Sequence, residues 1–494
     1  MSSKISLEQA PVKTDNNLVG VVLAAGRGLR AYPASHYIPK ALMEIAGQPL
    51  IDRTLAILTD KLGARKVIIV IGHCGDQIVS HLSSGNYGVE LVFVEQKELR
   101  GIGHALMMTE PHVGKGPFIV MLGDEFYLGS NHERLLEHDL SNCAGVLMFR
   151  QEPDLKKIAA NYTGEIRNRR VQALIEKPVN PRDGLMGVGS YLLTSTIFDY
   201  IRRTPPSDLR NEIELTDALS RMAQREIVMA EILSGFYVNI NHIDDLQKAN
   251  NLARSYEFDR KKVTLLIPAY NEADTIADVI EEFRACNRLN EILIVDNNSS
   301  DQTAEIAVKA GTRVIKETRQ GYGFALRRGL EEAAGDIIII TEADGSFSAN
   351  DIPKFLEYLK DCDMVIGTRT TRQMIEQGAN MGGLVRWANV FYGKIIELLW
   401  WGQEPRFTDV GCTYRAVWKT SYEKIRPYLK TAGPEFSPEM IIAMLICRKR
   451  VIEIPVTYRK RMGGTSKHSG GFFSLARTAV KMMDVILKLR YRYR

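Results

Sequence analysis

Short apolar runs alternate with amphipathic stretches along most of the 494 residues, and this pattern begins a second time at Val263. The first half contains "VGVVLAA", "KVIIVIG" and "PFIVMLG", and the second contains "VTLLIPA", "EILIVD" and "DIIIIT". Such runs between amphipathic stretches are typical of parallel sheets covered by helices. The sequence therefore predicts an α/β chain with two Rossmann-like nucleotide-binding domains in tandem, each a mostly parallel sheet flanked by helices.

The length also requires more than one domain, because a single hydrophobic core rarely grows beyond about 250–300 residues. Before the pattern restarts, "IDDLQKANNLARSYEFDRKK" reads as a polar helix that runs into a charged linker. We expect a flexible N-terminal tail at residues 1–17, a first domain at 18–257 and a second at 258–494. The second ends in "KMMDVILKLRYRYR", which predicts a basic amphipathic C-terminal helix.

Charge and cysteine content exclude several classes of protein. The formal net charge is only +5, which does not indicate a nucleic-acid partner. The six cysteines stand singly without a CxxC pair, so neither a zinc site nor a disulfide framework is expected. The N-terminus lacks the apolar core of a signal peptide, and no apolar run approaches the roughly 20 residues of a membrane span. We therefore expect a cytoplasmic protein.

Two strand ends in the first half carry residues suited to phosphate and metal binding. The strand "VVLAA" ends at Gly26, and Gly26 and Gly28 would let backbone N–H groups approach phosphates. Arg30 and Lys40 add positive charge to the same loop. Asp124 follows the apolar run "PFIVMLG", where a carboxylate together with nucleotide phosphates fits Mg²⁺.

These segments resemble the sugar-phosphate nucleotidyltransferase family over roughly residues 18–250. The stretch "GRGLRAYPASHYIPK" resembles its GxGxRxxP…PK signature, with Leu29 in place of the usual threonine. The residues that the resemblance implies for nucleotide binding are Leu23, Ala25, Gly26, Gly28, Gln96 and Gly101, the last two reading the base. The motif "IEKP" implies Glu176 and Lys177 as neighbours of the sugar phosphate.

The implied reaction is attack by a sugar-1-phosphate oxygen on the α-phosphorus of an NTP, which forms an NDP-sugar and releases pyrophosphate. In this reaction Arg30 would hold the β- and γ-phosphates, Lys40 the charge at the α-phosphate, and Asp124 the Mg²⁺ or Mn²⁺ ion. In "YVNINHIDDLQKAN" the usual second metal-binding Asp is replaced by Asn239 or Asn241, which we expect to serve the metal. This change and "GIGHA" resemble uridylyltransferases, so UTP is favoured.

The second half also has acidic residues that follow directly on the end of a predicted strand. Glu342 and Asp344 follow the apolar run "DIIIIT" at positions i and i+2, where both can face one cation bound to a diphosphate. The segment resembles the inverting family 2 glycosyltransferases over residues 262–468, especially polyprenyl-phosphate glycosyltransferases such as dolichyl-phosphate mannose synthases. Glu342 stands where the family has the first Asp of its DxD motif. The residues implied for nucleotide binding are Pro268, Tyr270, Glu272 and Asp296.

Two further segments resemble the family's acceptor side. "FTDVGCTYRA" contributes Asp409 and Arg415, and "EIPVTYRKRMGGTSK" contributes Arg461, Ser466 and Lys467. Asp409 is a general base if the acceptor is a hydroxyl, whereas it orients other groups if the acceptor is an ionised lipid phosphate. The other four residues would then bind that phosphate.

Two sites in one chain are consistent with a bifunctional enzyme in which the first site makes the NDP-sugar and the second transfers the sugar, with a polyprenyl phosphate as the expected acceptor. One alternative is transfer to another acceptor, combined with CTP-dependent nucleotidyl transfer to a non-sugar alcohol phosphate. Another is that one domain is a degenerate binding or regulatory scaffold, which Leu29, Asn239 and Glu342 would support. Retention of Lys40, Asp124 and Asp344 argues against the scaffold.

The C-terminal part raises the question of a membrane surface. "LVRWANVFYGKIIELLWW" has apolar residues at helical spacing, which indicates either a core helix or a helix at a membrane surface. Residues 481–494 interleave basic and apolar side chains. They could contact anionic lipid at the inner face of the cytoplasmic membrane, or form a helix packed on the catalytic domain with a solvated basic end.

Overall fold

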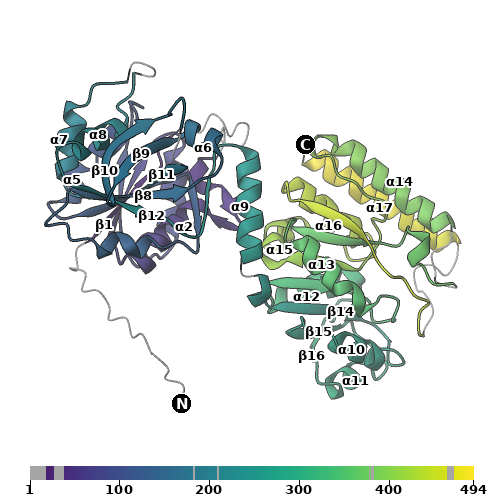
Figure 1. Cartoon of the computed structure of the whole chain (residues 1–494). Coiled ribbons are helices and arrows are strands. Elements are labelled where there is room, and N and C mark those ends of the chain that lie inside the picture. The colour runs from purple at the N-terminus through teal and green to yellow at the C-terminus, as the bar shows by residue number, and fades with distance from the viewer. Residues whose placement is uncertain are drawn as a thin grey trace, which may run out of the picture. The chain divides into compact units, whose positions relative to one another are not determined.

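The computed structural model describes residues 18–26, 38–181, 184–207, 211–256, 258–377, 379, 383–463 and 472–493. The tail expected at residues 1–17 lies outside this part. Contacts divide the chain into two compact units, the first ending at Ala253 and the second beginning at Arg254. Helix α9 (Ile243–Tyr256) carries the chain from one unit into the other (Figure 1). Both units are α/β, as the sequence predicts.

The first unit is built on a nine-stranded sheet. Across the sheet the order is β5 (Glu90–Glu95), β4 (Lys66–Ile71), β1 (Val19–Leu23), β6 (Phe118–Leu122), β11 (Leu185–Leu193), β8 (Gly145–Gln151), β12 (Val228–Ile232), β10 (Arg170–Glu176) and β9 (Tyr162–Arg167). The first four strands in this order are parallel, whereas β11 runs antiparallel to both of its neighbours. Two short sheets accompany it, β7 (Glu125–Leu128) with β13 (Phe236–Asn239) and β2 (Glu44–Ile45) with β3 (Gln48–Pro49).

Helices cover both faces of this sheet because its strands are apolar on both sides. Val21 of β1 lies in a cluster with residues of α4 (Ile102–Met107), α7 (Thr196–Arg203) and α8 (Leu215–Ala223). The neighbouring Val22 lies in a second cluster with α2 (Leu50–Ala56) and α3 (Gly75–Ser84). The remaining helices of the unit are α5 (Glu110–Val113) and α6 (Leu155–Ala160).

The second unit is built on a seven-stranded sheet. The order is β16 (Arg313–Lys316), β15 (Glu291–Asp296), β14 (Val263–Ala269), β17 (Ile337–Ile340), β19 (Arg415–Trp418), β18 (Met364–Thr368) and β20 (Val451–Pro455). Only β19 runs antiparallel to its neighbours, so the described sheet is mostly parallel, as predicted. The helices are α10 (Ile276–Arg284), α11 (Thr303–Lys309), α12 (Tyr322–Glu332), α13 (Ile352–Leu359), α14 (Gly383–Leu399), α15 (Lys419–Ile425), α16 (Phe436–Ile446) and α17 (Phe472–Arg492).

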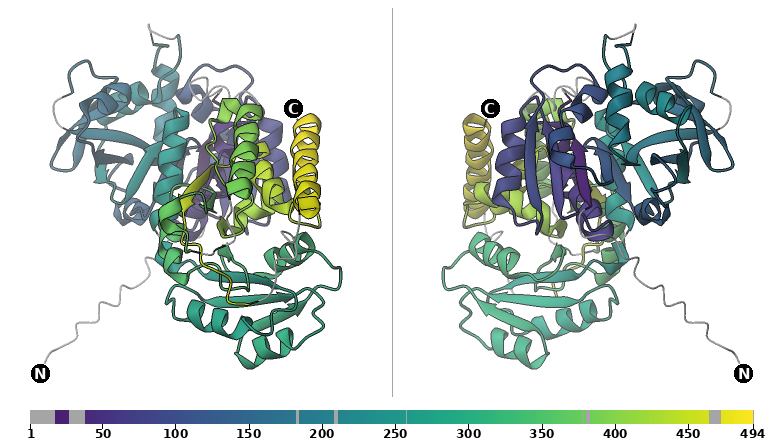
Figure 2. Two further views of the ribbon diagram at one scale, coloured as in Figure 1. Left: turned by 90° about the vertical axis from the view of Figure 1, so that its right-hand side faces the viewer. Right: turned by 90° about the vertical axis from the view of Figure 1, so that its left-hand side faces the viewer.

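The C-terminal helix α17 uses its apolar face for packing. Ile486 and Leu489 are buried in one cluster with α16, and α17 lies beside α14 (Figures 1 and 2), where the Tyr392 hydroxyl donates to the Ala479 carbonyl at 3.0 Å. This packing favours the second of the two interpretations of residues 481–494, a helix seated on the catalytic domain.

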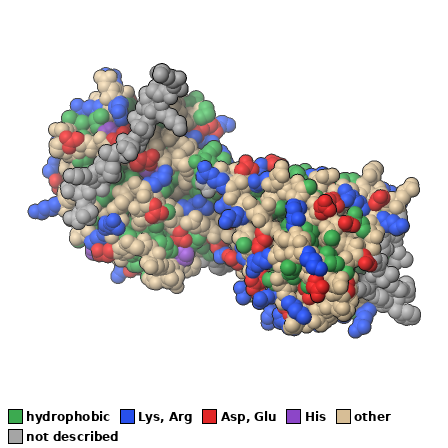
Figure 3. Space-filling model, turned by 90° about the horizontal axis from the view of Figure 1, so that it is seen from below, with side chains coloured by type: hydrophobic (Ala, Val, Ile, Leu, Met, Phe, Trp, Pro, Cys, Tyr) green, Lys and Arg blue, Asp and Glu red, His purple; other side chains and the backbone are tan. Residues whose placement is uncertain are grey.

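Within the described ranges, no helix combines the length and the apolar character needed to cross a bilayer. On the face that Figure 3 shows, Lys and Arg side chains are interspersed with Asp and Glu rather than gathered in one patch.

Candidate active sites

A cavity of about 760 Å³ opens at the carboxyl ends of β1 and β6 in the first unit. It brings together every predicted residue of the first site that the structure describes: Leu23, Ala25, Gly26, Lys40, Gln96, Gly101, Asp124, Glu176, Lys177, Asn239 and Asn241. Gly28 and Arg30 lie outside the described residues. The volume falls in the range of small-molecule sites in proteins.

Strand register explains why residues so distant in sequence meet here. Leu23 pairs with Leu122 in the parallel ladder of β1 and β6, so Gly26 and Asp124 leave the sheet at the same edge. The Ile240 N–H donates to the Asp124 carbonyl at 2.9 Å, which brings the end of β13 to the same place. Asn239 and Asn241 reach the cavity through this contact.

Lys40 contacts two other residues that line the cavity, Asp124 and Asn241. Its Nζ lies 3.2 Å from Asp124 Oδ2 and donates to Asn241 Oδ1 at 3.4 Å. The Lys40 side chain is 12% exposed and that of Asp124 35%, so both remain accessible from the cavity. An ammonium and a carboxylate held together can neutralise phosphate charge and hold a cation at adjacent points.

The donor set near Asp124 fits Mg²⁺ or Mn²⁺. These ions take oxygen ligands, commonly one or two carboxylates together with substrate phosphates. Asn239 Oδ1 is buried without a hydrogen-bond partner, although it belongs to a residue that lines the cavity. An orphaned amide oxygen beside a carboxylate is suited to a cation or to a ligand donor. In the described ranges, no cluster of three His, Cys, Asp or Glu side chains forms a protein-only metal site.

One group of lining residues contains those expected to read the base. Gln96 is buried, and its Nε2 donates to the Gly101 carbonyl at 3.2 Å and to His104 Nδ1 at 3.0 Å. Gly101 has φ +100°, and a Cβ there would lie 2.7 Å from the Ile213 carbonyl oxygen. Only glycine fits this close backbone approach.

Another group of lining residues contains those expected beside the sugar phosphate. Glu176 Oε2 accepts a hydrogen bond from Thr216 Oγ1 at 2.9 Å, and the Lys177 N–H donates to the Asn161 carbonyl at 2.7 Å. Lys177 has φ +46°, which directs the chain sharply after β10. Tyr162 and Asn161 complete this wall of the cavity.

The second unit places its predicted nucleotide residues at the carboxyl ends of β14 and β15. Ala269 pairs with Asp296 in their parallel ladder, so Pro268, Tyr270 and Asp296 share one edge of the sheet. Asp296 Oδ1 accepts a hydrogen bond from the Ser299 N–H at 3.2 Å. The backbone N–H of Glu272 donates to Thr303 Oγ1 at 2.8 Å.

Glu342 and Asp344 lie just beyond β17 at this same edge, where both approach Arg461. The Arg461 Nε is 2.8 Å from Asp344 Oδ2, and one terminal nitrogen is 3.9 Å from Glu342 Oε2. Burial, together with the negative charge of Asp344, raises the pKa of Glu342. Since two carboxylates already face one guanidinium cation, the pair also fits a divalent cation.

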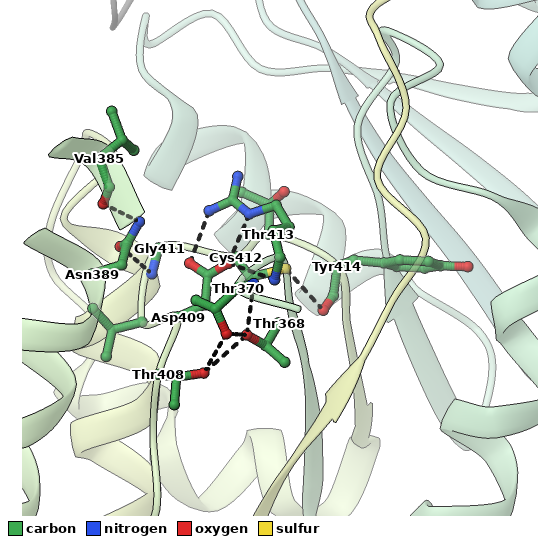
Figure 4. A network of polar contacts seen from close by, with 12 residues as sticks. Thr368, Thr370, Val385, Asn389, Thr408, Asp409, Gly411, Cys412, Thr413 and Tyr414 are labelled. Atoms are coloured by element: carbon green, nitrogen blue, oxygen red, sulfur yellow. Dashed lines mark hydrogen bonds and ion pairs between the residues drawn. The ribbon is translucent and has the colours of Figure 1, made fainter. Parts of the chain in front are cut away.

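Asp409 lies in a network of buried polar groups around the strand β18. Its side chain is fully buried and both oxygens accept from Arg369, Nε donating at 2.8 Å and a terminal nitrogen at 2.9 Å. Burial alone would lower the pKa of Arg369, but the charge of Asp409 raises it well above its usual value. The hydroxyls of Thr368, Thr370 and Thr408 join in a triangle beside this pair (Figure 4).

Comparison with known proteins finds a family match in each of the two units. Residues 19–255 match the family model "Nucleotidyl transferase", and residues 264–419 match "Glycosyl transferase family 2". The chain joins a nucleotidyl transferase domain to a glycosyl transferase family 2 domain. It is therefore an enzyme of the transferase class, and the fusion suspected from the sequence is confirmed.

Relatives of the nucleotidyl transferase domain act on sugar phosphates, by their names. It is 29% identical over 232 residues to the UTP–glucose-1-phosphate uridylyltransferase of Haloferax volcanii, which covers 46% of this chain and 93% of that protein. It is 28% identical over 235 residues to the glucose-1-phosphate thymidylyltransferase of Streptomyces griseus, which covers 47% of this chain and 65% of that protein. A crystal structure of a UDP-glucose pyrophosphorylase with UDP-glucose matches 49% of this chain and 99% of that one, with 24% identity and a TM-score of 0.43.

The nucleotidyl transferase domain contains a buried acid that sequence reasoning missed. Glu125 directly follows Asp124, is 3% exposed, and accepts hydrogen bonds from Tyr127, from Tyr237 at 2.6 Å and from the Gly189 N–H at 2.8 Å. Burial raises its pKa to about 7. These bonds connect β7 with β13 and β11 at the residue that follows Asp124. Its signal in the sequence was an acid at the start of an otherwise apolar strand.

The glycosyl transferase domain does not hold all of the expected acceptor residues in reach of a ligand. Arg415 is 2% exposed and donates to the carbonyls of Cys412, Val410 and Ser437. It begins β19, an inner strand of the sheet, so its guanidinium supports the fold, which speaks against the expected phosphate contact. Ser466 and Lys467 lie outside the described residues. Arg461 remains the one expected acceptor residue that the structure places beside the acidic pair.

Proposed function

We propose that the nucleotidyl transferase domain joins UTP to a sugar-1-phosphate with release of pyrophosphate, and that the glycosyl transferase domain passes the sugar of the NDP-sugar to a polyprenyl phosphate. The observation that carries the first half is the single cavity in which all described residues predicted for that site meet, with Lys40 3.2 Å from Asp124.

The arrangement of that cavity supports a division of labour. Gln96 and Gly101 would receive the base, and Glu176 with Thr216 would orient the sugar hydroxyls in the same cavity. Lys40, which also lines the cavity, would neutralise charge at the α-phosphate as the sugar phosphate attacks. A divalent cation held at Asp124 and Asn239 would neutralise the triphosphate.

UTP is proposed because of two lines of support. The residues around "GIGHA" and the asparagines at 239 and 241 resemble uridylyltransferases, and the relative from Haloferax volcanii is named as one. The thymidylyltransferase relative makes dTTP the second candidate, because its identity to this chain is nearly the same. Both bases are pyrimidines that differ by one methyl group.

The polyprenyl phosphate acceptor is supported by the state of Asp409. An acceptor hydroxyl needs a general base with a free carboxylate oxygen near it. Both oxygens of Asp409 are instead engaged by Arg369 inside the protein. A phosphate oxygen is already ionised at neutral pH, so it needs no base, and Arg461, which lies 2.8 Å from Asp344, would balance its charge.

Pyrophosphate release over a matrix of UTP, dTTP, CTP and several sugar-1-phosphates tests the first half. We expect the highest rate with UTP and one sugar-1-phosphate. A rate confined to CTP and a non-sugar alcohol phosphate would establish the alternative chemistry, and no release with any pair would indicate a binding scaffold. Transfer of radiolabelled sugar from the resulting NDP-sugar to a short-chain polyprenyl phosphate tests the second half, with a polyprenyl alcohol as the acceptor control.

A further inference from the structure

Helix α14 presents a stripe of large apolar side chains to solvent. Trp387, Phe391 and Leu398 are 75%, 57% and 70% exposed, and they follow one another at helical positions i, i+4 and i+11. Trp401, just beyond the helix, is 70% exposed. A solvated helix normally carries polar residues on such a face, so this apolar stripe indicates a surface that binds another molecule or a membrane.

The neighbouring helix α17 has an exposed face that is rich in positive charge. Its exposed positions carry the basic residues Arg477, Lys481, Lys488 and Arg492 and the single acid Asp484. Val480, Leu487 and Tyr491 lie among them and are 69%, 51% and 86% exposed. The two helices are held side by side by the bond from Tyr392 to Ala479 and by Arg490, which lies over the Trp400 ring at 5.4 Å.

We infer that the outer faces of α14 and α17 together bind the surface of an anionic lipid bilayer. Trp and Phe side chains favour the boundary between headgroups and acyl chains, and basic residues around them are attracted to anionic headgroups. A protein partner or a second copy of this chain would not require the basic border. The inference rests on the proposed function in one respect, because a bilayer is where a polyprenyl phosphate resides.

Membrane binding by the outer faces of α14 and α17 differs from membrane binding by the C-terminal residues 481–494 alone. The apolar residues Ile486 and Leu489 of α17 are buried against the domain and cannot enter a bilayer without unfolding the helix from it. The side chains that remain available are those on the outer faces, and α14 carries Trp387, the largest of them, together with Phe391. Membrane binding should therefore depend on Trp387 and Phe391 more than on the last residues of the chain.

Vesicle flotation of the full chain tests the inference, with vesicles of phosphatidylcholine and phosphatidylglycerol that contain no polyprenyl phosphate. We expect binding at low salt that weakens with salt and is absent with phosphatidylcholine alone. The double variant Trp387→Gln, Phe391→Gln should bind at least about tenfold more weakly, because it removes two interfacial aromatic side chains. The control Val308→Gln, Tyr358→Gln changes two exposed apolar residues of the same domain (59% and 49%) on other helices and should bind like the parent.

Two results would overturn the inference: no flotation of the parent chain, and equal flotation of the parent and the α14 variant. In the second case, a dimeric parent and a monomeric variant would assign the stripe to a second copy of the chain. Sugar transfer to a water-soluble short-chain acceptor is measured separately. If the parent chain shows no such sugar transfer, this result counts against the proposed function and not against membrane binding, because flotation does not require catalysis.

Discussion

Arg369 and Asp409 form a two-point ion pair inside the glycosyl transferase domain, with nitrogen–oxygen distances of 2.8 Å and 2.9 Å. The Arg369 backbone N–H also donates to Asp409 at 2.9 Å. On the opposite side, Glu453 accepts hydrogen bonds from the N–H groups of Thr408 and Asp409, each at 2.7 Å. Arg369 therefore holds the Asp409 carboxylate and Glu453 holds its backbone, which favours a positioning role for Asp409.

Asp409→Asn should destabilise the glycosyl transferase domain by about 3–5 kcal/mol, because it leaves the buried charge of Arg369 uncompensated. All four tryptophans lie in this domain, so denaturation followed by tryptophan fluorescence reports on it alone. The control Asp361→Asn, at an exposed position, should unfold like the parent. Unchanged stability combined with complete loss of sugar transfer would identify Asp409 as a general base instead.

Lys40→Ala should slow pyrophosphate release about a hundredfold, because it removes one preorganised charge contact at the phosphates. The exposed Lys115→Ala provides a matched control in the same domain and should keep the parent rate. Sugar transfer from externally added NDP-sugar should be unaffected. If Lys40→Ala releases pyrophosphate at nearly the parent rate, the role proposed for Lys40 is wrong.

Asp344→Ala should abolish sugar transfer while pyrophosphate release stays within about twofold of the parent. It removes the carboxylate that Arg461 approaches to 2.8 Å, and this carboxylate belongs to the second site alone. The two reactions are measured on the same preparation, with Asp361→Ala as the control for a lost surface carboxylate. Parallel loss of both reactions in a folded variant would contradict the two-site proposal.

Glu453 should make the stability of the second domain depend on pH. Burial raises its pKa to about 7 from the ordinary value of 4.5. The folded domain therefore keeps a proton that the unfolded chain releases between these values, so its contribution to stability is full below pH 4.5 and is lost as the pH rises to about 7.

Tryptophan-detected denaturation between pH 5 and 7 measures this dependence. The free energy of unfolding of the parent should fall more steeply with pH than that of Glu453→Gln, by up to about 1.4 kcal/mol per pH unit. Glu281→Gln, an exposed residue on α10, should retain the parent slope. Equal slopes in the parent and in Glu453→Gln would show that this carboxyl is ionised throughout the range.

Much of the nucleotidyl transferase cavity could be predicted because its residues follow strand ends directly. Gly26 and Asp124 come just after β1 and β6, and parallel strands that pair in register place such residues at one edge. The acidic pair Glu342 and Asp344 was predictable for the same reason, since it follows β17. Pattern and local position were sufficient wherever a residue follows directly on the end of a parallel strand.

The alternation of apolar runs determined by itself that this chain forms two α/β units, because the spacing of buried side chains is a local property. Only the tertiary structure decided the partners of Arg415, Asp409 and Glu125. Arg415 is buried because β19 inserts antiparallel between β17 and β18, and Asp409 meets Arg369 across 40 residues of sequence. Strand order and side-chain pairing arise from contacts between distant segments, and a one-dimensional pattern does not encode which of those contacts form.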